Sequence, residues 1–360
     1  MAKIQPIEAR GYYFTGQSVK LEPRNFAIDN VNDQEVVIAV SGCGLCHTDL
    51  GFLREGIKTK KEPPLILGHE ISGRVVATGA ASRSWQGKAV IVPAVLPCGE
   101  CELCRAGRDN ICPKQIMPGN DIDGGFASHV VVPSRFLCPL PDDTKGIPLS
   151  HFSVIADAVT TPYQSLQRSG LKKDELAVVI GAGGIGSYMI QHARNVGARV
   201  VAIDIDDKKP ERALRSGANL SINSKNLTEK EIKEKIKIWT KQEKVASFGW
   251  KIFEMSGSAP GQGLAFALLG FAGTLGIVGF TMEKVTIRLS NIMAYDGDIF
   301  GNWGCSPKYY PAVAQDILNG RIQIKENVET FSLSQINEVI QMAIEHKLER
   351  RAVLIPEGGV

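Results

Sequence analysis

The stretch VIGAGGIGSYMI, residues 179–190, carries glycines in the spacing G-x-G-x-x-G. It follows the apolar run LAVVIG and opens a segment with the apolar periodicity of a helix. Glycines at this spacing allow a tight turn and a close approach of the backbone to a pyrophosphate at the helix N-terminus. The turn predicts a dinucleotide-binding unit, and its candidate residues are Gly181, Gly183, Gly184, Ile185 and Gly186.

An acidic residue stands where such a unit needs one. The next apolar segment, RVVAID, ends in Asp204, eighteen residues after Gly186. A carboxylate at this place binds the ribose hydroxyls and repels the additional phosphate of NADP, so NAD is the favoured coenzyme. The alternative is a glycine-rich turn beside a solvated acid, and the order of strand, turn, helix and strand favours the coenzyme.

Around this unit, strand-like and helix-like segments alternate from about residue 175 onward. This order is typical of an α/β fold with a parallel, doubly wound sheet. Before about residue 150, short strand-like runs such as EVVIAV (35–40) alternate with Gly and Pro turns, which predicts a β-rich domain. The C-terminal segment 334–356 has the pattern of one helix followed by one strand.

Length and composition narrow the class of protein. A chain of 360 residues favours two domains, and a net charge of +3 without a basic stripe argues against nucleic acid as a partner. The uncharged run 263–280 contains five glycines, so we expect a buried helix, a turn and a strand there in place of a membrane span. The N-terminus lacks the apolar segment of a secretory signal, and we expect a cytoplasmic enzyme.

Half of the eight cysteines lie in one short segment, PCGECELCRAGRDNICP, with the spacing C-x2-C-x2-C-x7-C. Four thiolates so close together suit one tetrahedral zinc ion, and a site closed by four protein ligands is structural. An iron–sulfur cluster is the second possibility, ranked below zinc. The predicted ligands are Cys98, Cys101, Cys104 and Cys112.

A third group of polar residues lies in GCGLCHTDLG (42–51) and LGHE (67–70). Cys46 and His69 are good zinc ligands, and Thr48 and Glu70 stand beside them. A cysteine and a histidine at this separation carry little information alone, since a buried cysteine and a turn histidine are common.

Taken together, these motifs resemble those of the zinc-dependent alcohol dehydrogenases, in the medium-chain dehydrogenase/reductase family. The resemblance extends over nearly the whole chain. It implies a GroES-like β-barrel catalytic domain, residues 1–156 completed by 300–360, and a Rossmann NAD-binding domain, residues 157–299. It also implies two zinc ions per chain, one catalytic and one structural.

The resemblance gives a role to Asp157 in the segment ADAVTTPYQ. Family members usually hold the catalytic zinc with Cys, His and a second Cys that lies six residues before a tyrosine. Here the tyrosine is Tyr163 and the residue six places earlier is Asp157. We therefore expect Cys46, His69 and Asp157 as ligands, since a carboxylate carries the charge of a thiolate. In the alternative, Asp157 caps the following helix and Glu70 takes the third place, or the site holds no metal.

Other roles follow from the same resemblance. Thr48 is expected to take the alcohol proton and His47 to meet the coenzyme pyrophosphate. Lys209 matches a basic residue near the adenosine ribose, and Val278 and Phe280 fall where backbone groups contact the nicotinamide. Many members have a histidine three residues after the Thr, but this chain has Gly51 there, which leaves the end of the proton relay unassigned between His47, Asp49, water and the ribose.

The longer segments 117–133, 156–164, 279–294 and 301–305 resemble one subgroup, the 6-hydroxycyclohex-1-ene-1-carbonyl-CoA dehydrogenases of anaerobic aromatic degradation. This resemblance implies a CoA-thioester substrate. The lysines of REGIKTKKEPP (54–64) would attract its phosphates, unless the run is a solvated loop. A simple cyclic, allylic or aromatic alcohol is the competing substrate. Family members are mostly homodimers or homotetramers, and a tetramer is expected here.

Overall fold

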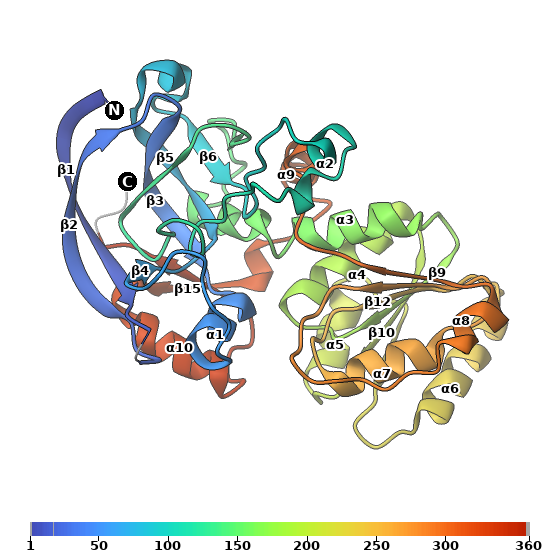
Figure 1. Cartoon of the computed structure of the whole chain (residues 1–360). Helices are drawn as coiled ribbons and strands as arrows, with labels where there is room; N and C mark the ends of the chain where they lie inside the picture. Colours follow the sequence, from blue (N-terminus) through green and yellow to red (C-terminus); the bar gives the residue numbers. More distant parts are fainter. Residues whose placement is uncertain (1, 17, 358–360) are drawn as a thin grey trace. The chain divides into compact units, whose positions relative to one another are not determined.

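The chain folds into two compact units in the computed structural model, which describes residues 2–16 and 18–357 (Figure 1). The first unit comprises residues 1–160 and 304–360, and the second comprises residues 161–303. Asp157 lies in the first unit together with Cys46 and His69.

The second unit is built on a parallel sheet of six strands in the order β11-β10-β9-β12-β13-β14. The order places the first strand of the unit, β9, in the middle, as expected of a doubly wound fold. The strands are β9 (Leu176–Ile180), β10 (Arg199–Asp204), β11 (Leu220–Asn223), β12 (Lys251–Glu254), β13 (Thr274–Ile277) and β14 (Asp298–Gly301). The helices are α3 (Thr160–Ser169), α4 (Gly184–Val196), α5 (Lys209–Arg215), α6 (Glu229–Gln242), α7 (Ala259–Leu268) and α8 (Ser290–Tyr295).

Both faces of this sheet are covered, and its central strand β9 is apolar and buried at every position. In β9, Val178 and Ile180 point into the core with α6 and α7, whereas Ala177 and Val179 pack with α4. This alternation follows from the two-residue period of a strand. Figure 1 shows α6 and α7 on the same side of the sheet. The apolar run 263–280 folds as predicted, into the end of α7, a turn and β13.

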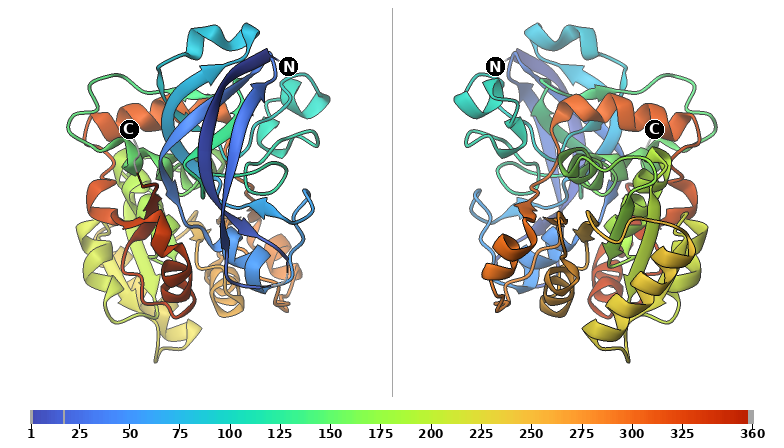
Figure 2. Two further views of the ribbon diagram at one scale, coloured as in Figure 1. Left: turned by 90° about the vertical axis from the view of Figure 1, so that its left-hand side faces the viewer. Right: turned by 90° about the vertical axis from the view of Figure 1, so that its right-hand side faces the viewer.

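The first unit contains mainly antiparallel strands in two sheets, one in the order β2-β1-β4 and one in the order β15-β16-β3-β5-β6-β8, with β7 paired to β3. The strands are β1 (Ala2–Phe14), β2 (Glu22–Val31), β3 (Glu35–Gly44), β4 (Leu65–Ile66), β5 (Glu70–Thr78), β6 (Ala89–Val92), β7 (His129–Pro133), β8 (Cys138–Pro139), β15 (Val328–Ser332) and β16 (Arg351–Ile355). Figure 2 shows the long β1–β2 hairpin in dark blue.

Helices of the first unit are short. They are α1 (His47–Arg54), α2 (Glu102–Arg105), α9 (Tyr310–Leu318) and α10 (Ile336–Ile344), with 3-10 turns η1 (Ala80–Trp85), η2 (Asp109–Ile111), η3 (Leu149–Ala156), η4 (Pro307–Tyr309), η5 (Lys325–Asn327) and η6 (Leu333–Gln335). Ile336 and Ile340 of α10 and Leu354 of β16 are buried in one core with Val36, Ile38 and other residues of β3. The C-terminal segment therefore packs into the core of the first unit.

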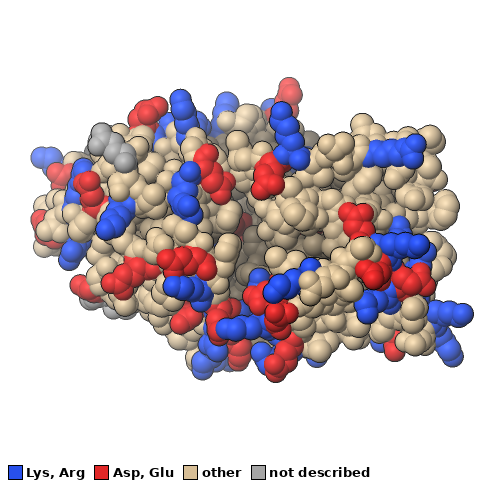
Figure 3. All heavy atoms as spheres, turned by 90° about the horizontal axis from the view of Figure 1, so that it is seen from below, with Lys and Arg blue, Asp and Glu red and all other residues tan. Residues whose placement is uncertain are grey.

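Charged side chains are spread without a dominant sign. On the face drawn in Figure 3, lysines and arginines lie among aspartates and glutamates. The net charge is only +3. Within the part of the chain that the structure describes, no helix has the length and apolar character needed to cross a membrane.

Candidate functional site

Four cysteines converge in the segment between β6 and β7. Their sulfur atoms are 3.4 Å apart for Cys101 and Cys104, 3.5 Å for Cys98 and Cys112, 3.7 Å for Cys101 and Cys112, and 3.9 Å for Cys98 and Cys104. A tetrahedral zinc ion with Zn–S bonds of about 2.3 Å holds its sulfur atoms roughly 3.8 Å apart. The cluster thus has the size of a four-thiolate zinc site.

The thiols of this cluster differ in pKa. A hydrogen bond from the Glu100 backbone lowers the pKa of Cys98 to about 6, whereas burial raises the pKa of Cys104 to about 12. Four neighbouring thiols cannot all lose their protons without a positive charge among them. A zinc ion supplies that charge and binds thiolates.

Cys46 is positioned by the start of α1. It is the N-cap residue, and its backbone N–H donates to Asp49 Oδ2 at 2.9 Å, which closes a capping box. The other carboxylate oxygen of Asp49 accepts the Gly68 N–H at 3.2 Å and lies 3.7 Å from His69 Nδ1. Asp49 therefore links the helix that carries Cys46 to the turn that carries His69.

The structure brings Cys46, His69, Glu70 and Asp157 together, with one ligand atom of each lying within 4.8 Å of the others. Asp157 Oδ2 is 3.7 Å from Cys46 Sγ and 3.7 Å from His69 Nε2. Ligand atoms around a tetrahedral zinc lie roughly 3.3–3.8 Å apart when the bonds are about 2.0–2.3 Å. Cys46, His69 and Asp157 therefore fit a zinc ion in donor type and in spacing.

Glu70 is engaged elsewhere. Its side chain is fully buried, and both carboxylate oxygens accept from the Arg351 guanidinium, one of them at 3.1 Å from Nε. The Ala158 N–H also donates to Oε1 at 3.1 Å. Burial raises the pKa of Glu70, while the positive charge of Arg351 opposes the shift. Because both Glu70 oxygens are already occupied by a guanidinium, Asp157 is the better third ligand.

The electrostatics of the cluster favour a bound cation. Burial alone lowers the pKa of His69, but the negative charges of Asp49, Cys46 and Asp157 outweigh it and raise that pKa well above the ordinary value. The environment thus stabilises positive charge at the imidazole. A zinc ion at Nε2 would take the place of that proton, and Asp49 Oδ1, 3.7 Å from Nδ1, lies on the side of the ring where carboxylates stand beside zinc-bound histidines.

Thr48 and His47 follow Cys46 on α1. The half-buried Thr48 places Oγ1 3.6 Å from Cys46 Sγ, so its hydroxyl lies beside the candidate zinc ligands. His47 is exposed, with Nε2 3.4 Å from Glu55 Oε1. Gly51 is buried, and a Cβ there would lie 2.9 Å from Ile57 Cδ1, so a histidine at this position would require Ile57 to move.

The glycine turn of the second unit has the shape that the sequence predicts. Gly181 has φ +87°, and a Cβ on it would lie 2.7 Å from the Ser256 backbone. A Cβ on Gly186 would lie 1.7 Å from Gly181 O, which explains the close packing of α4 on β9. Gly183, the N-cap of α4, has open space around its Cβ position. That open face is where a pyrophosphate would approach the backbone.

The remaining candidates of this unit lie at the carboxyl edge of the same sheet. Asp204 ends β10 and accepts the Ala182 N–H at 2.8 Å, and Lys209 Nζ lies 3.5 Å from the same carboxylate oxygen. Val278 and Phe280 follow β13, which is parallel to β12 and thus ends at the same edge. Phe280 is 51% exposed. Ligands of doubly wound sheets bind at this edge.

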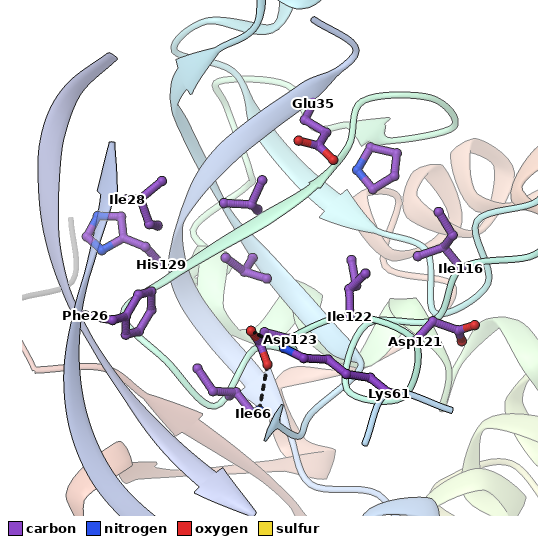
Figure 4. A pocket seen from close by; sticks show the side chains of 13 residues that line it. Phe26, Ile28, Glu35, Lys61, Ile66, Ile116, Asp121, Ile122, Asp123 and His129 are labelled. Atoms are coloured by element: carbon purple, nitrogen blue, oxygen red, sulfur yellow. Dashed lines mark hydrogen bonds and ion pairs between the residues drawn. The ribbon is translucent and has the colours of Figure 1, made fainter. Parts of the chain in front are cut away.

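Two lysines of the run 54–64 are paired within the chain. Lys60 Nζ lies 2.6 Å from Asp121 Oδ1, and Lys61 Nζ lies 2.7 Å from Asp123 Oδ2. Figure 4 shows Lys61 and Asp123 side by side at a cavity of about 350 Å³ whose lining includes none of the zinc-ligand candidates. The run therefore offers less free positive charge to CoA phosphates than the sequence suggests.

Arg351 is the main residue of the site that sequence reasoning missed. It stands in the apolar strand β16, 281 residues away from its partner Glu70. A single charged residue at the start of a strand gives no local signal of such a pairing. Asp49, which the sequence left between a turn hydrogen bond and a relay role, forms the capping bonds and faces His69.

Two protein-family models match this chain. A family model described as "Alcohol dehydrogenase GroES-like domain" matches residues 32–142, and one described as "Zinc-binding dehydrogenase" matches residues 184–319. An alcohol dehydrogenase of Geobacillus stearothermophilus is 30% identical over 337 residues, which cover 93% of this chain and 95% of the relative.

Solved structures share the fold. Galactitol-1-phosphate dehydrogenase from Escherichia coli superposes with a TM-score of 0.86 at 23% identity, covering 96% of this chain and 100% of that one. Acetophenone reductase from Geotrichum candidum, in complex with NAD, gives a TM-score of 0.82 at 23% identity, with 98% of each chain covered. The predicted combination of a GroES-like domain and a Rossmann domain is confirmed. The chain belongs to the zinc-dependent medium-chain alcohol dehydrogenase family.

Proposed function

We propose that this protein oxidises an alcohol with NAD, using a zinc ion held by Cys46, His69 and Asp157. The observation that carries the proposal is the position of Asp157 Oδ2, 3.7 Å from both Cys46 Sγ and His69 Nε2. The occupation of both Glu70 oxygens by Arg351 supports Asp157 over Glu70 as the third ligand. The four-cysteine cluster would hold a second, structural zinc.

Each residue near the site then has a task. When bound, zinc polarises the alcohol oxygen and lowers its pKa, and NAD accepts the hydride. Cys46, His69 and Asp157 would bring two negative charges to a zinc ion, and a site with three protein ligands would keep a place for the substrate. Thr48, with its hydroxyl 3.6 Å from Cys46 Sγ, accepts the alcohol proton and passes it on.

The exit of that proton differs from the common relay because residue 51 is glycine. Asp49 is a poor final base, since its two oxygens already accept the N–H groups of Cys46 and Gly68 and it is fully buried. His47 is exposed, so its imidazole can reach the solvent. We assign the exit to the coenzyme ribose with His47 or water beyond it.

Coenzyme binding is assigned to the turn of residues 181–186 and to Asp204, with Lys209, Val278, Phe280 and His47 as further contacts. The open face at Gly183 supports binding of a dinucleotide, and the carboxylate of Asp204 at the end of β10 supports NAD over NADP. The existing ion pair of Lys209 with Asp204 keeps a cation near the expected ribose.

The substrate class that these features support best is a simple cyclic, allylic or aromatic alcohol. The CoA thioester implied by the subgroup resemblance remains a narrower candidate, favoured by segments such as ADAVTTPYQ. The pairing of Lys60 and Lys61 with aspartates weakens it, because phosphates need free cations.

The test is a substrate panel in which NADH formation is followed with cyclohex-2-enol, benzyl alcohol, cyclohexanol and 6-hydroxycyclohex-1-ene-1-carbonyl-CoA. Faster turnover of the free alcohols supports the proposed class. A kcat/KM at least about tenfold higher for the thioester would replace that class with CoA esters. The absence of NADH formation with every alcohol would refute the dehydrogenase proposal.

A homo-oligomer, a tetramer or at least a dimer, is part of the proposal. Among the described strands, β14 pairs only with β13, so it lies at the edge of its sheet. Large apolar side chains are exposed in and just before it, including Leu289 and Met293. Exposed edges and apolar patches favour association with a second copy. Sedimentation of the wild type and of Leu289→Glu would test this, and a monomeric wild type would contradict it. The cytoplasmic location also remains a prediction.

A further inference from the structure

Asp157 lies in a segment without regular secondary structure. The turn η3 ends at Ala156 and α3 begins at Thr160, and Asp157 has φ −144° and ψ −59°. A carboxylate on such a segment approaches a metal only if the main chain on either side is fixed. The contacts of that main chain therefore decide where Asp157 Oδ2 lies.

On the C-terminal side of Asp157, the segment bonds to Glu70 and to the preceding turn. The Ala158 N–H donates to Glu70 Oε1 at 3.1 Å, and the Thr160 hydroxyl donates to the Ile155 carbonyl at 2.7 Å. On the N-terminal side, the carbonyl of Ala156 accepts a hydrogen bond from the Tyr310 hydroxyl. This carbonyl belongs to the peptide group that joins Ala156 to Asp157.

Tyr310 reaches this point from a distant part of the chain. It is the first residue of α9, and its side chain is fully buried. The hydroxyl also accepts the Ala94 N–H at 3.3 Å, and the Ala94 N–H lies 3.3 Å from the Ala156 carbonyl as well. One phenol thus joins the end of the β6 segment, the Asp157 segment and the start of α9.

We propose that Tyr310 is a positioning residue of the zinc site, holding the peptide before Asp157 so that the carboxylate faces Cys46 and His69. The inference rests on the proposed ligand role of Asp157 and extends it to a residue of the C-terminal segment. A phenylalanine would fill the same space but leave the Ala156 carbonyl with only the long contact to Ala94 N. Partners of metal ligands, when removed, typically weaken metal binding by about 10–100-fold.

The test compares Tyr310→Phe with the wild type and with Tyr12→Phe, which removes the hydroxyl of another buried tyrosine in the same unit, on β1. The first readout is the rate at which zinc passes to a chelator. We expect Tyr310→Phe to release one zinc about tenfold faster while the four-cysteine zinc leaves at its wild-type rate. Tyr12→Phe should release both ions at wild-type rates.

The second readout is the absorption spectrum after the zinc at Cys46, His69 and Asp157 is replaced by Co²⁺, because cobalt d–d bands report ligand geometry. We expect shifted bands in Tyr310→Phe and unchanged bands in Tyr12→Phe, with the KM for NAD kept within about twofold of the wild type. Wild-type zinc release and spectrum in Tyr310→Phe would overturn the proposal. Loss of both zinc ions together with cooperative unfolding would also overturn it, by showing a general role in folding.

Asp157→Ala, measured in parallel, separates this inference from the proposed function. If Asp157→Ala loses the zinc at Cys46 and His69 but Tyr310→Phe behaves as the wild type, the ligand assignment stands and the role of Tyr310 fails. If Asp157→Ala keeps two zinc ions with unchanged release rates, the ligand assignment itself fails, and the role of Tyr310 fails with it.

Discussion

Replacing Arg351 with alanine should strongly destabilise the first unit. Glu70 is 0% exposed and the Arg351 side chain is 10% exposed, so the variant leaves a carboxylate in the interior without its cation. Removing one partner of a buried ion pair costs about 3–5 kcal/mol. The hydrogen bond from Ala158 N remains, which places the expected loss near the lower end, about 3 kcal/mol.

This loss can be measured by heat unfolding of the zinc-loaded protein, followed by circular dichroism at one scan rate. For a folding unit of roughly 200 residues, each kcal/mol corresponds to about 2–4 °C in Tm, so we expect a decrease of about 6–12 °C. Arg350→Ala is the matched control, since Arg350 is the exposed neighbour in the chain. It should leave Tm nearly unchanged.

Two further variants examine the cause. Arg351→Lys keeps the charge but loses the bidentate pairing with Glu70, so its Tm should lie between those of Arg351→Ala and the wild type. The double variant Glu70→Gln/Arg351→Met removes both charges and should recover part of the loss. A Tm of Arg351→Ala within about 2 °C of the wild type would refute the reasoning that Glu70 depends on this pair.

Three other outcomes are expected. Cys101→Ser should lower the zinc content by one ion per chain and lower Tm, and two retained ions measured by elemental analysis would contradict the four-cysteine site. Asp204→Ala should reduce the preference for NAD over NADP by about tenfold or more in kcat/KM, whereas Asp207→Ala, at an exposed ion pair with Lys225, should not; equal ratios in both variants would disprove the role of Asp204. Burial raises the pKa of Glu254, which is 0% exposed at the end of β12. Because its pKa is raised in the folded state, the protonated Glu254 carboxyl stabilises the fold. This stabilisation is fully present below the unfolded-state pKa of about 4.5 and is lost as pH rises through the raised folded-state pKa. Glu254→Gln should therefore gain Tm relative to the wild type between pH 5 and pH 8, and a constant difference would contradict the shift.

Local patterns in the sequence predicted the parts of the fold that depend on local rules. The glycine turn, the capped helix α4 and the buried strands β9 and β10 each follow from periodicity and turn chemistry, and all of them form. The four-cysteine site was predictable because its four ligands lie within one short segment. Cys46 and His69 became meaningful only through the family resemblance, because their separation in sequence has no fixed geometric meaning.

Residues that act across long sequence distances escaped prediction. The β1–β2 hairpin pairs 13- and 10-residue strands whose mixed polar pattern gave no strand signal. Arg351 reaches Glu70 across 281 residues, and Tyr310 reaches Ala156 across 154. Such contacts are set by how the C-terminal segment returns to the first unit, and a strand or helix pattern contains no information about its distant partner.

The most direct test of the account is a crystal structure with anomalous diffraction measured at the zinc absorption edge. We expect one peak among Cys98, Cys101, Cys104 and Cys112, and a second peak bonded to Cys46 Sγ, His69 Nε2 and Asp157 Oδ2, with Glu70 still paired to Arg351. A second peak bonded to Glu70 in place of Asp157, or no peak between Cys46 and His69, would contradict the central claim.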